Sequence, residues 1–249
     1  MTSIPGISVV NNSLKCTPLG LEMLGGVHVS LTRAAPEYLE FIYSCYQNDA
    51  FMDLYRLAQS RAVSKQGVLQ RLETEQSKLP QELKRIEWVI LKHELGQLVP
   101  IGLAALADHQ VSHRRAEFLL GIPDVQDRVG HLSLEASLLV LDFAFNQVGL
   151  HKVTAFVYGY NAYAQKNILH LGFTQEGFLA QHIYTQKGFI DLYQNALLRT
   201  DFISNKTLSR LSKRLLNKDI TQPQSAKIRP VSAPLLEQLS QQLKPSSGL

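Results

Sequence analysis

The chain has 249 residues, of which 45% are apolar and 18% charged, so it is long enough to bury a substantial hydrophobic core. No apolar run approaches the ~20 residues of a membrane-spanning helix, and the N-terminus lacks the basic and apolar regions of a secretory signal peptide. The two cysteines, Cys16 and Cys45, form no metal-binding spacing. This favours reduced thiols over a disulfide and predicts a cytoplasmic protein.

The net charge of +4 is distributed unevenly along the chain. Beyond Phe202, eight Lys or Arg stand against two acids, a charge of +6, which leaves −2 for the first 202 residues. A nucleic-acid-binding surface would place basic residues on the folded body with aromatic residues between them. The charge pattern therefore argues against a nucleic-acid partner for the main domain.

The first half of the chain predicts one strand, two helices and then three strands. Residues 1–26 show little periodicity and are expected to form an irregular N-terminal arm. A helix that begins at Pro36 and a polar helix over 64–78 follow from apolar spacing and from a proline in the first turn. Alternation of apolar and polar residues predicts strands over 27–31, 85–95, 99–107 and 115–122.

The second half predicts helices and strands in alternation. The expected elements are a helix over 134–147, a strand over 152–157, a helix opened by Asn161, and strands over 174–181 and 189–199. Together the elements predict an α/β (α+β) protein with a mixed, mostly antiparallel sheet of about seven strands flanked by about four helices. No internal repeat is present.

Beyond Phe202 the sequence changes character. Leu208, Leu211, Leu215 and Leu216 form a helical stripe, and a second short stripe follows after a Pro-containing stretch. We therefore expect a folded domain over 27–202 and a basic amphipathic tail over 203–249 that the domain does not need for folding. A solvated terminal helix, a lid or dimer element, and a docking segment for a partner or an anionic surface remain open.

The segment from Arg115 to Arg199 carries the strongest functional signal. A strand leads into the loop Arg128–Ser133, and this loop leads into a helix. The first N–H groups of a helix have no intrahelical partner, and the helix dipole favours an anion beside them. The arrangement predicts a nucleotide-type ligand held by its phosphates, and an ordinary helix-initiating turn is the alternative.

These residues resemble the GNAT superfamily of acyl-coenzyme A-dependent N-acyltransferases, with the RimJ/RimL-like branch as the closest match. The resemblance covers roughly residues 27–202. The motif Arg/Gln-x-x-Gly-x-Gly/Ala aligns with Arg128–Ser133 and is followed by the typical Glu135-Ala136, although His131 replaces a glycine. Supporting positions are Gly102, Asn161, Leu171-Gly172-Phe173, Gly188–Asp191, Leu197–Arg199 and Asp201-Phe202.

The resemblance implies the GNAT fold, an acyl-coenzyme A donor and a primary-amine acceptor that attacks it directly. The acceptor is a peptide or protein N-terminus, a lysine or ornithine side chain, or a polyamine. Backbone N–H groups of the loop would hold the pyrophosphate, Asn161 would lie near the pantetheine arm or act as a plain helix cap, and a strand N–H would stabilise the oxyanion. The implied donor-binding residues are Leu119, Leu120, Gly121, Arg128, Val129, Gly130, His131, Leu132, Ser133 and Asn161. No metal is expected, since His109 and His113 flank a turn, and a homodimer is one option for assembly.

Glu117 is the candidate general base. The acceptor amine starts as an ammonium ion with a pKa of ~10 and must lose a proton before it attacks. The RimJ/RimL-like branch commonly has an acid on this strand, although the spacing from Glu117 to Glu135 is one residue longer than expected. The alternative is a solvated or ion-paired strand carboxylate, with Arg115 as a candidate partner.

The chain departs from the family pattern at the general acid. Ile168 stands where many relatives have a tyrosine, and Ala164 stands where the branch often has a serine. The apolar replacements favour an acyl chain longer than acetyl. A non-catalytic acyl-coenzyme A-binding protein and an adaptor whose basic tail binds RNA or an anionic membrane are the rival interpretations.

Overall fold

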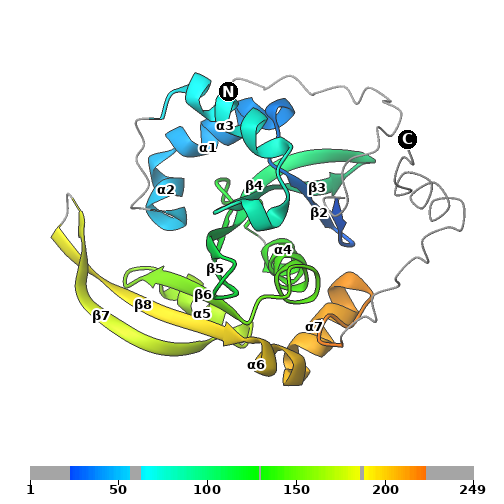
Figure 1. The fold of residues 1–249 in the computed structure, drawn as a ribbon, viewed down its shortest axis with the longest axis vertical. Coiled ribbons are helices and arrows are strands. Elements are labelled where there is room, and N and C mark those ends of the chain that lie inside the picture. Colours follow the sequence, from blue (N-terminus) through cyan, green and yellow to red (C-terminus); the bar gives the residue numbers. More distant parts are fainter. Residues whose placement is uncertain (1–22, 57–62, 129, 186–187, 223–249) are drawn as a thin grey trace, which may run out of the picture.

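A computed structural model describes residues 23–56, 63–128, 130–185 and 188–222 and places them around one twisted sheet (Figure 1). The strand order is β1-β2-β3-β4-β5-β6-β8-β7, and β5 and β6 are the parallel pair in an otherwise antiparallel arrangement. The strands are β1 (Leu24–Gly25), β2 (Val29–Arg33), β3 (Ile86–Glu94), β4 (Gln97–Gln110), β5 (Arg115–Gly121), β6 (Lys152–Tyr158), β7 (Thr174–Thr185) and β8 (Gly188–Leu198). The mixed, mostly antiparallel sheet is confirmed, with the short edge strand β1 as the addition.

The helices agree with the sequence pattern in the main and differ in three places, one of which is a short helix over 199–204 that the sequence did not predict. They are α1 (Leu39–Gln47), α2 (Asp49–Tyr55), α3 (Lys65–Gln76), α4 (Gly130–Asp142), α5 (Ala162–His170), α6 (Arg199–Ser204) and α7 (Lys206–Leu216). The helix expected from Pro36 is a 3₁₀ turn followed by α1 and α2, because Asn48 ends α1 and caps α2 by accepting the Phe51 N–H. Helix α4 begins at Gly130, before the expected start at Leu134, and continues as a π-helical segment, Phe143–Gln147.

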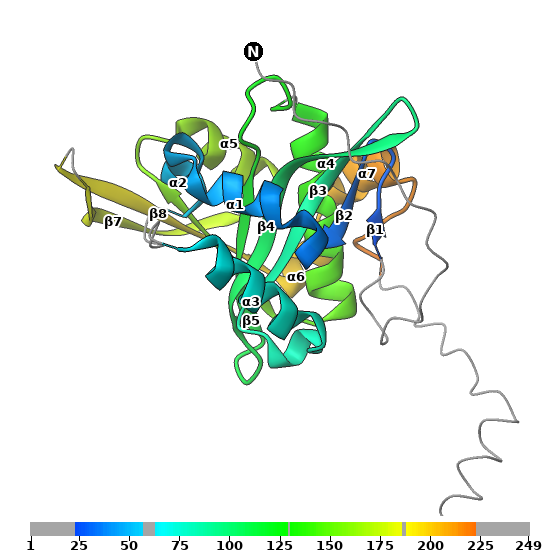
Figure 2. The same cartoon turned by 90° about the horizontal axis from the view of Figure 1, so that it is seen from above.

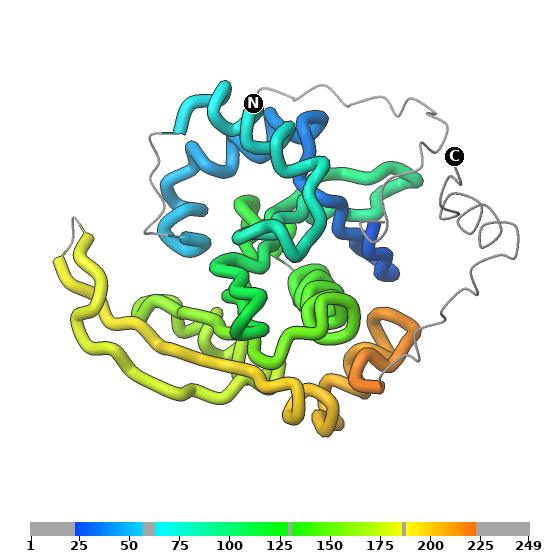
Figure 3. Tube along the Cα trace, in the orientation of Figure 1, coloured from blue at the N-terminus to red at the C-terminus, as the bar shows by residue number. Residues whose placement is uncertain are grey.

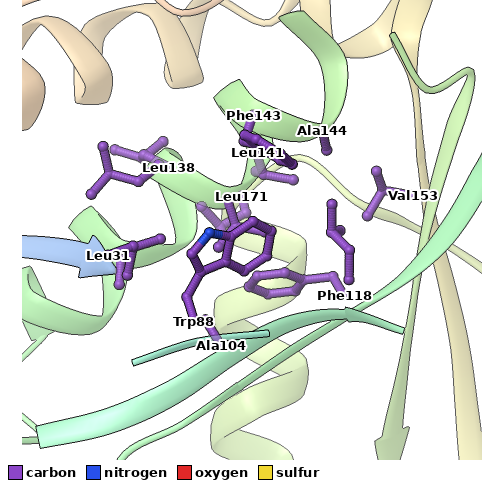
Figure 4. Packing of buried hydrophobic residues seen from close by; sticks show 14 of the residues in the cluster. Leu31, Trp88, Ala104, Phe118, Leu138, Leu141, Phe143, Ala144, Val153 and Leu171 are labelled. Atoms are coloured by element: carbon purple, nitrogen blue, oxygen red, sulfur yellow. The ribbon is translucent and has the colours of Figure 1, made fainter. Parts of the chain in front are cut away.

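Helix α4 lies on one face of the sheet and α1 to α3 lie on the other (Figures 1 and 2). Helix α4 is largely apolar on all sides, which suits a helix buried between the sheet and another layer. Trp88 of β3 meets Phe143 edge to face with ring centroids 5.0 Å apart, in the cluster that Figure 4 shows. This face forms the main core.

The opposite face carries a buried ionic network. The Glu87 carboxylate, almost completely buried, accepts hydrogen bonds from the Tyr46 hydroxyl at 2.7 and 2.8 Å and from Arg71 at 3.0 Å, and it pairs with Arg85. Burial alone would raise the pKa of Glu87, but Arg85 and Arg71 hold it below its ordinary value. The network ties α1 and α3 to β3.

We expect Glu87→Ala to destabilise the protein by about 3–5 kcal/mol, because it leaves two guanidinium groups beside an empty, water-poor site. Glu40→Ala, which removes the exposed partner of Lys65, should change the free energy of unfolding by less than about 1 kcal/mol. Urea titration of the two variants measures both values. Equal losses would mean that the buried network is not what joins these helices to the sheet.

Helix α7 packs against α4 (Figure 3). Its leucine stripe and Ile220 belong to the main core cluster. The side chain of Asn146 donates to the Ile220 carbonyl at 2.8 Å, and Lys218 pairs with Asp142 at 2.6 Å. From this packing we propose that the folded domain extends to about residue 222, beyond the boundary expected at 202. Residues 1–22 of the expected arm and 223–249 of the expected tail lie outside the described residues.

Within the part of the chain that the structure describes, no helix is long and apolar enough to cross a membrane.

Candidate functional site

Strands β5 and β6 separate along their length. They pair only from Arg115 opposite Lys152 to Glu117 opposite Thr154, while each keeps its antiparallel partner on the other side. Alternate residues of a strand point their N–H and C=O groups toward each edge, so the part of β5 beyond Glu117 presents backbone groups toward a gap between the strands. The gap opens a cleft in the middle of the sheet.

A cavity of about 700 Å³ occupies this cleft. Strands β5 and β6, the start of α4 and helix α5 supply most of its wall, with additions from α2 and α7. The lining residues are Phe51, Leu54, Tyr55, Phe118–Ile122, Arg128, His131, Ser133, Leu134, Ser137, Ala155–Tyr158, Asn161, Tyr163, Ala164, Asn167, Ile168, His170, Leu171, Arg214 and Leu215. This set contains two arginines, two histidines and no carboxylate, so the lining favours an anionic ligand.

The N-terminus of α4 lies at the cavity. Because the helix begins at Gly130, the N–H groups of residues 130–132 have no acceptor within it, and His131 and Ser133 line the cavity. Arg128 donates from Nε to the Ile122 carbonyl at 2.8 Å and from a terminal nitrogen to the Pro123 carbonyl at 3.0 Å. Arg128 therefore braces the loop that carries β5 into α4.

His131 belongs to a small polar cluster. Its ring meets the His28 ring edge to face with centroids 5.0 Å apart, and the His28 ring lies 2.9 Å from the Glu135 carboxylate. Glu135 is completely buried and accepts the backbone N–H groups of His28 and Val29 at 2.8 and 3.2 Å. Glu135 thus ties β2 to α4 and lies outside the cavity, while His131 is exposed within it.

The structure brings seven of the ten predicted donor-binding residues to the cavity wall. These are Leu119, Leu120, Gly121, Arg128, His131, Ser133 and Asn161. Leu132 is buried in the main core instead, because the helix turns its side chain inward, and Gly130 is the first residue of α4. Val129 lies outside the described residues. The roles of these residues remain predictions.

Gly121 marks a close approach between β5 and α2. A Cβ at this position would lie 2.6 Å from a ring carbon of Phe51 and 3.0 Å from one of Tyr55. Only glycine lets these aromatic rings of α2 reach the strand here, and both rings line the cavity. Helix α2 thereby closes the cavity on the side opposite α4.

Glu117 lies where β5 and β6 begin to separate. Alternation along the strand puts it on the same face as Leu119, which belongs to the core of α1 to α3. Burial raises the pKa of Glu117 above its ordinary value, Arg56 lowers it in part, and Asp108 raises it further. The carboxylate is not among the residues that line the cavity, and Arg115 pairs with Asp108 at 3.1 Å.

Helix α5 carries the two positions, Ala164 and Ile168, at which the chain departs from the family pattern for the general acid. Asn161 caps the helix by accepting the Ala164 N–H at 3.1 Å, as its helix-capping interpretation predicts, and also lines the cavity. Ala164 and Ile168 line the cavity as well and have no group that donates a proton. At these two positions the cavity wall is apolar.

Sequence patterns missed the walls contributed by α2 and α7. Phe51 and Tyr55 have the appearance of ordinary core aromatics, and Arg214 has that of a solvated residue on an amphipathic helix. Their approach to β5 and α4 depends on packing between segments far apart in the chain. The sequence did carry a signal for the place of the cleft. Strands β5 and β6 are consecutive and joined by a helix, which predicts a parallel pair with a ligand at the end of the strands.

The sequence profile of a family described as Acetyltransferase (GNAT) domain matches residues 28–174. The chain is 31% identical over 146 residues to YoaA of Bacillus subtilis (strain 168), an uncharacterized N-acetyltransferase. That match covers 58% of this chain and 78% of YoaA.

Two solved structures of spermidine N-acetyltransferase from Vibrio cholerae have a similar fold. One is a complex with CoA and spermine, with a TM-score of 0.60 and 21% identity over 70% of this chain and 97% of that chain. The other is a dodecameric structure in an intermediate state, with a TM-score of 0.60 and 19% identity over 72% and 98%. At these identities the likeness shows the shared fold.

Proposed function

The chain belongs to the acetyltransferase (GNAT) domain family, and from this premise we propose that it is an acyl-coenzyme A-dependent N-acyltransferase of the RimJ/RimL-like branch. The observation that carries the proposal is the cavity in the gap between β5 and β6, with the start of α4 and cationic side chains in its wall. A cytoplasmic location belongs to the same proposal, since Cys45 is a free, buried thiol.

The residues at this cleft fit an acyl-coenzyme A. The N–H groups of residues 130–132, which have no acceptor within α4, suit a pyrophosphate, with Arg128 holding the loop that presents them. The edge of β5 at Leu119–Gly121, which faces the gap, suits the acyl carbonyl, and Asn161 lines the same cavity. When bound, the donor supplies a thioester that an amine attacks directly.

We propose Glu117 as the group that takes the proton from the acceptor ammonium. It lies at the base of the gap, and its raised pKa gives a stronger base than an ordinary glutamate. Since the carboxylate does not line the cavity, transfer through a bridging water is the expected route. No proton donor for the leaving thiolate is assigned to α5, and a thiol with a pKa near 8.5 leaves without full acid assistance.

We propose an acceptor with one amine next to an apolar or aromatic group. The cavity presents Phe51, Leu54 and Tyr55 from α2, and the part of its wall that the structure describes has no carboxylate. A polyamine would bring several positive charges into this wall without a counter-charge. A peptide N-terminus with an apolar first residue therefore suits the site better than spermidine or the side chains of lysine and ornithine.

A non-catalytic acyl-coenzyme A-binding protein is the second candidate, and the apolar residues Ala164 and Ile168 are the observation that favours it. The two candidates separate in an assay of free coenzyme A thiol with a panel of amines. Release of thiol that depends on the amine supports the transferase, whereas tight donor binding without release supports the second candidate.

Donor binding should stabilise the fold. At about 100 times its dissociation constant a ligand adds ~2.7 kcal/mol to the free energy of unfolding. Thermal melting with acetyl-, octanoyl- and palmitoyl-coenzyme A measures this, and a larger shift for the longer chains would support an apolar acyl site at Ala164 and Ile168. If none of the three raises the melting temperature, the proposed donor is wrong.

A further inference from the structure

Helix α7 lies outside the residues that match the GNAT family, yet its position is fixed at both ends. The Asn205 side chain caps it by accepting the N–H groups of Thr207 and Leu208 at 2.9 and 3.0 Å. At the other end, Lys218 pairs with Asp142 at 2.6 Å. The buried leucine stripe between these ends holds the helix against α4. The backbone position of any α7 residue that lines the cavity is therefore fixed.

Arg214 is that side chain. It lines the cavity together with Leu215, next to the wall that α4 and α5 provide. Lys213 pairs with Asp219 at 3.1 Å and Lys218 with Asp142, but among the described residues no hydrogen bond or ion pair is found for the Arg214 guanidinium. Asp219, which follows α7, and Asp142 of α4 thus pair with the two neighbouring lysines, and Arg214 stays available at the cavity.

The chemistry of the cavity limits what Arg214 can bind. Among the described residues no carboxylate lines the cavity, so the guanidinium has no counter-charge in that part of the wall. A guanidinium binds phosphate with two parallel hydrogen bonds. The α4 N–H groups already suit the pyrophosphate of a coenzyme A donor, and this donor carries one more phosphate, on its ribose.

We propose that Arg214 binds the ribose 3′-phosphate of the donor, so that α7 completes the donor site and selects coenzyme A over its 3′-dephospho form. This inference rests on the proposed function, because it takes the cleft to be a coenzyme A site. The donor site would then include a residue outside the segment 28–174 that matches the GNAT family.

The test measures dissociation constants of coenzyme A and 3′-dephospho-coenzyme A by calorimetry on the full chain. Loss of a hydrogen bond to a charged group should weaken coenzyme A binding to Arg214→Ala by about 10- to 100-fold. The same variant should bind the dephospho form as the unchanged protein does. Arg210→Ala is the matched control, since Arg210 is exposed on the same helix and does not line the cavity.

The outcomes separate the two proposals. If the unchanged protein binds neither compound, the proposed function fails. If it binds coenzyme A but Arg214→Ala binds as tightly, or if the variant weakens both compounds equally, the role of Arg214 is overturned. Arg214→Gln repeats the measurement with a neutral side chain of similar length, and melting of the ligand-free variants confirms that they are folded.

Discussion

Glu117→Gln is expected to lower kcat by about 10²–10⁴-fold, the typical contribution of a general base. The amide keeps the shape of the side chain but cannot accept the proton of the acceptor ammonium. Donor affinity should be unchanged, because Glu117 is not among the residues that line the cavity. Steady-state kinetics together with donor titration measure both quantities.

The pH dependence gives a sharper test of the same residue. Burial raises the pKa of Glu117, so kcat/KM should fall as the pH drops through that raised value, and Glu117→Gln should lack this acid limb. A carboxyl group with a raised pKa binds protons more readily in the folded state, so its contribution to stability falls as the pH rises through the range above 4.5. The glutamine variant should therefore be at least as stable as the unchanged protein at pH 7.

Glu94→Gln is the control for a strand carboxylate, since Glu94 is exposed and pairs with Lys92 at 3.1 Å. It should leave kcat and the pH profile unchanged. If Glu117→Gln retains near-normal kcat across the pH range, Glu117 is a structural residue and another group deprotonates the amine.

Ending the chain after Phe202 is expected to abolish cooperative unfolding or to lower the melting temperature steeply. The cut removes Leu208, Leu211, Leu215, Leu216 and Ile220 from the core. Each buried leucine or isoleucine contributes about 1.5–3 kcal/mol, so the loss is comparable to the 5–15 kcal/mol that typically stabilises a domain, even after the entropy gained by freeing the segment.

A chain that ends after Gln222 is the matched comparison. It keeps α7 and its contacts with Asp142 and Asn146 and should melt like the full chain. Calorimetry of the two truncated chains decides between the boundaries at 202 and 222. Equal melting of both would show that α7 is an appendage, as the sequence alone suggested.

The sequence by itself predicted most elements of the fold. Alternation along residues 86–94 and 115–121 identified β3 and β5, because successive side chains of a strand point to opposite faces of the sheet. Asn161 was predicted to cap α5 for a similarly local reason, since its side chain reaches an N–H only three residues away. The strand, loop and helix around residues 115–142 were located in the same way.

Local patterns also explain where the boundaries of elements were misjudged. Helix α4 starts at Gly130 since the first helical turn needs no apolar periodicity, and α1 ends early because Asn48 serves as a cap inside an otherwise helical pattern. Where local sequence signals allow more than one helix start or end, packing against the sheet decides between them.

Only the tertiary structure decided how the site is built. The separation of β5 from β6 after Glu117 and Thr154 depends on pairing between segments more than 30 residues apart in the chain. Whether Arg214 is solvated or lines the cavity depends on where α7 packs, and periodicity describes only which side of that helix is apolar. The buried leucines of α7, the approach of α2 to Gly121 and the placement of Glu117 outside the cavity wall follow from contacts across the whole domain, because burial is a property of the packed chain.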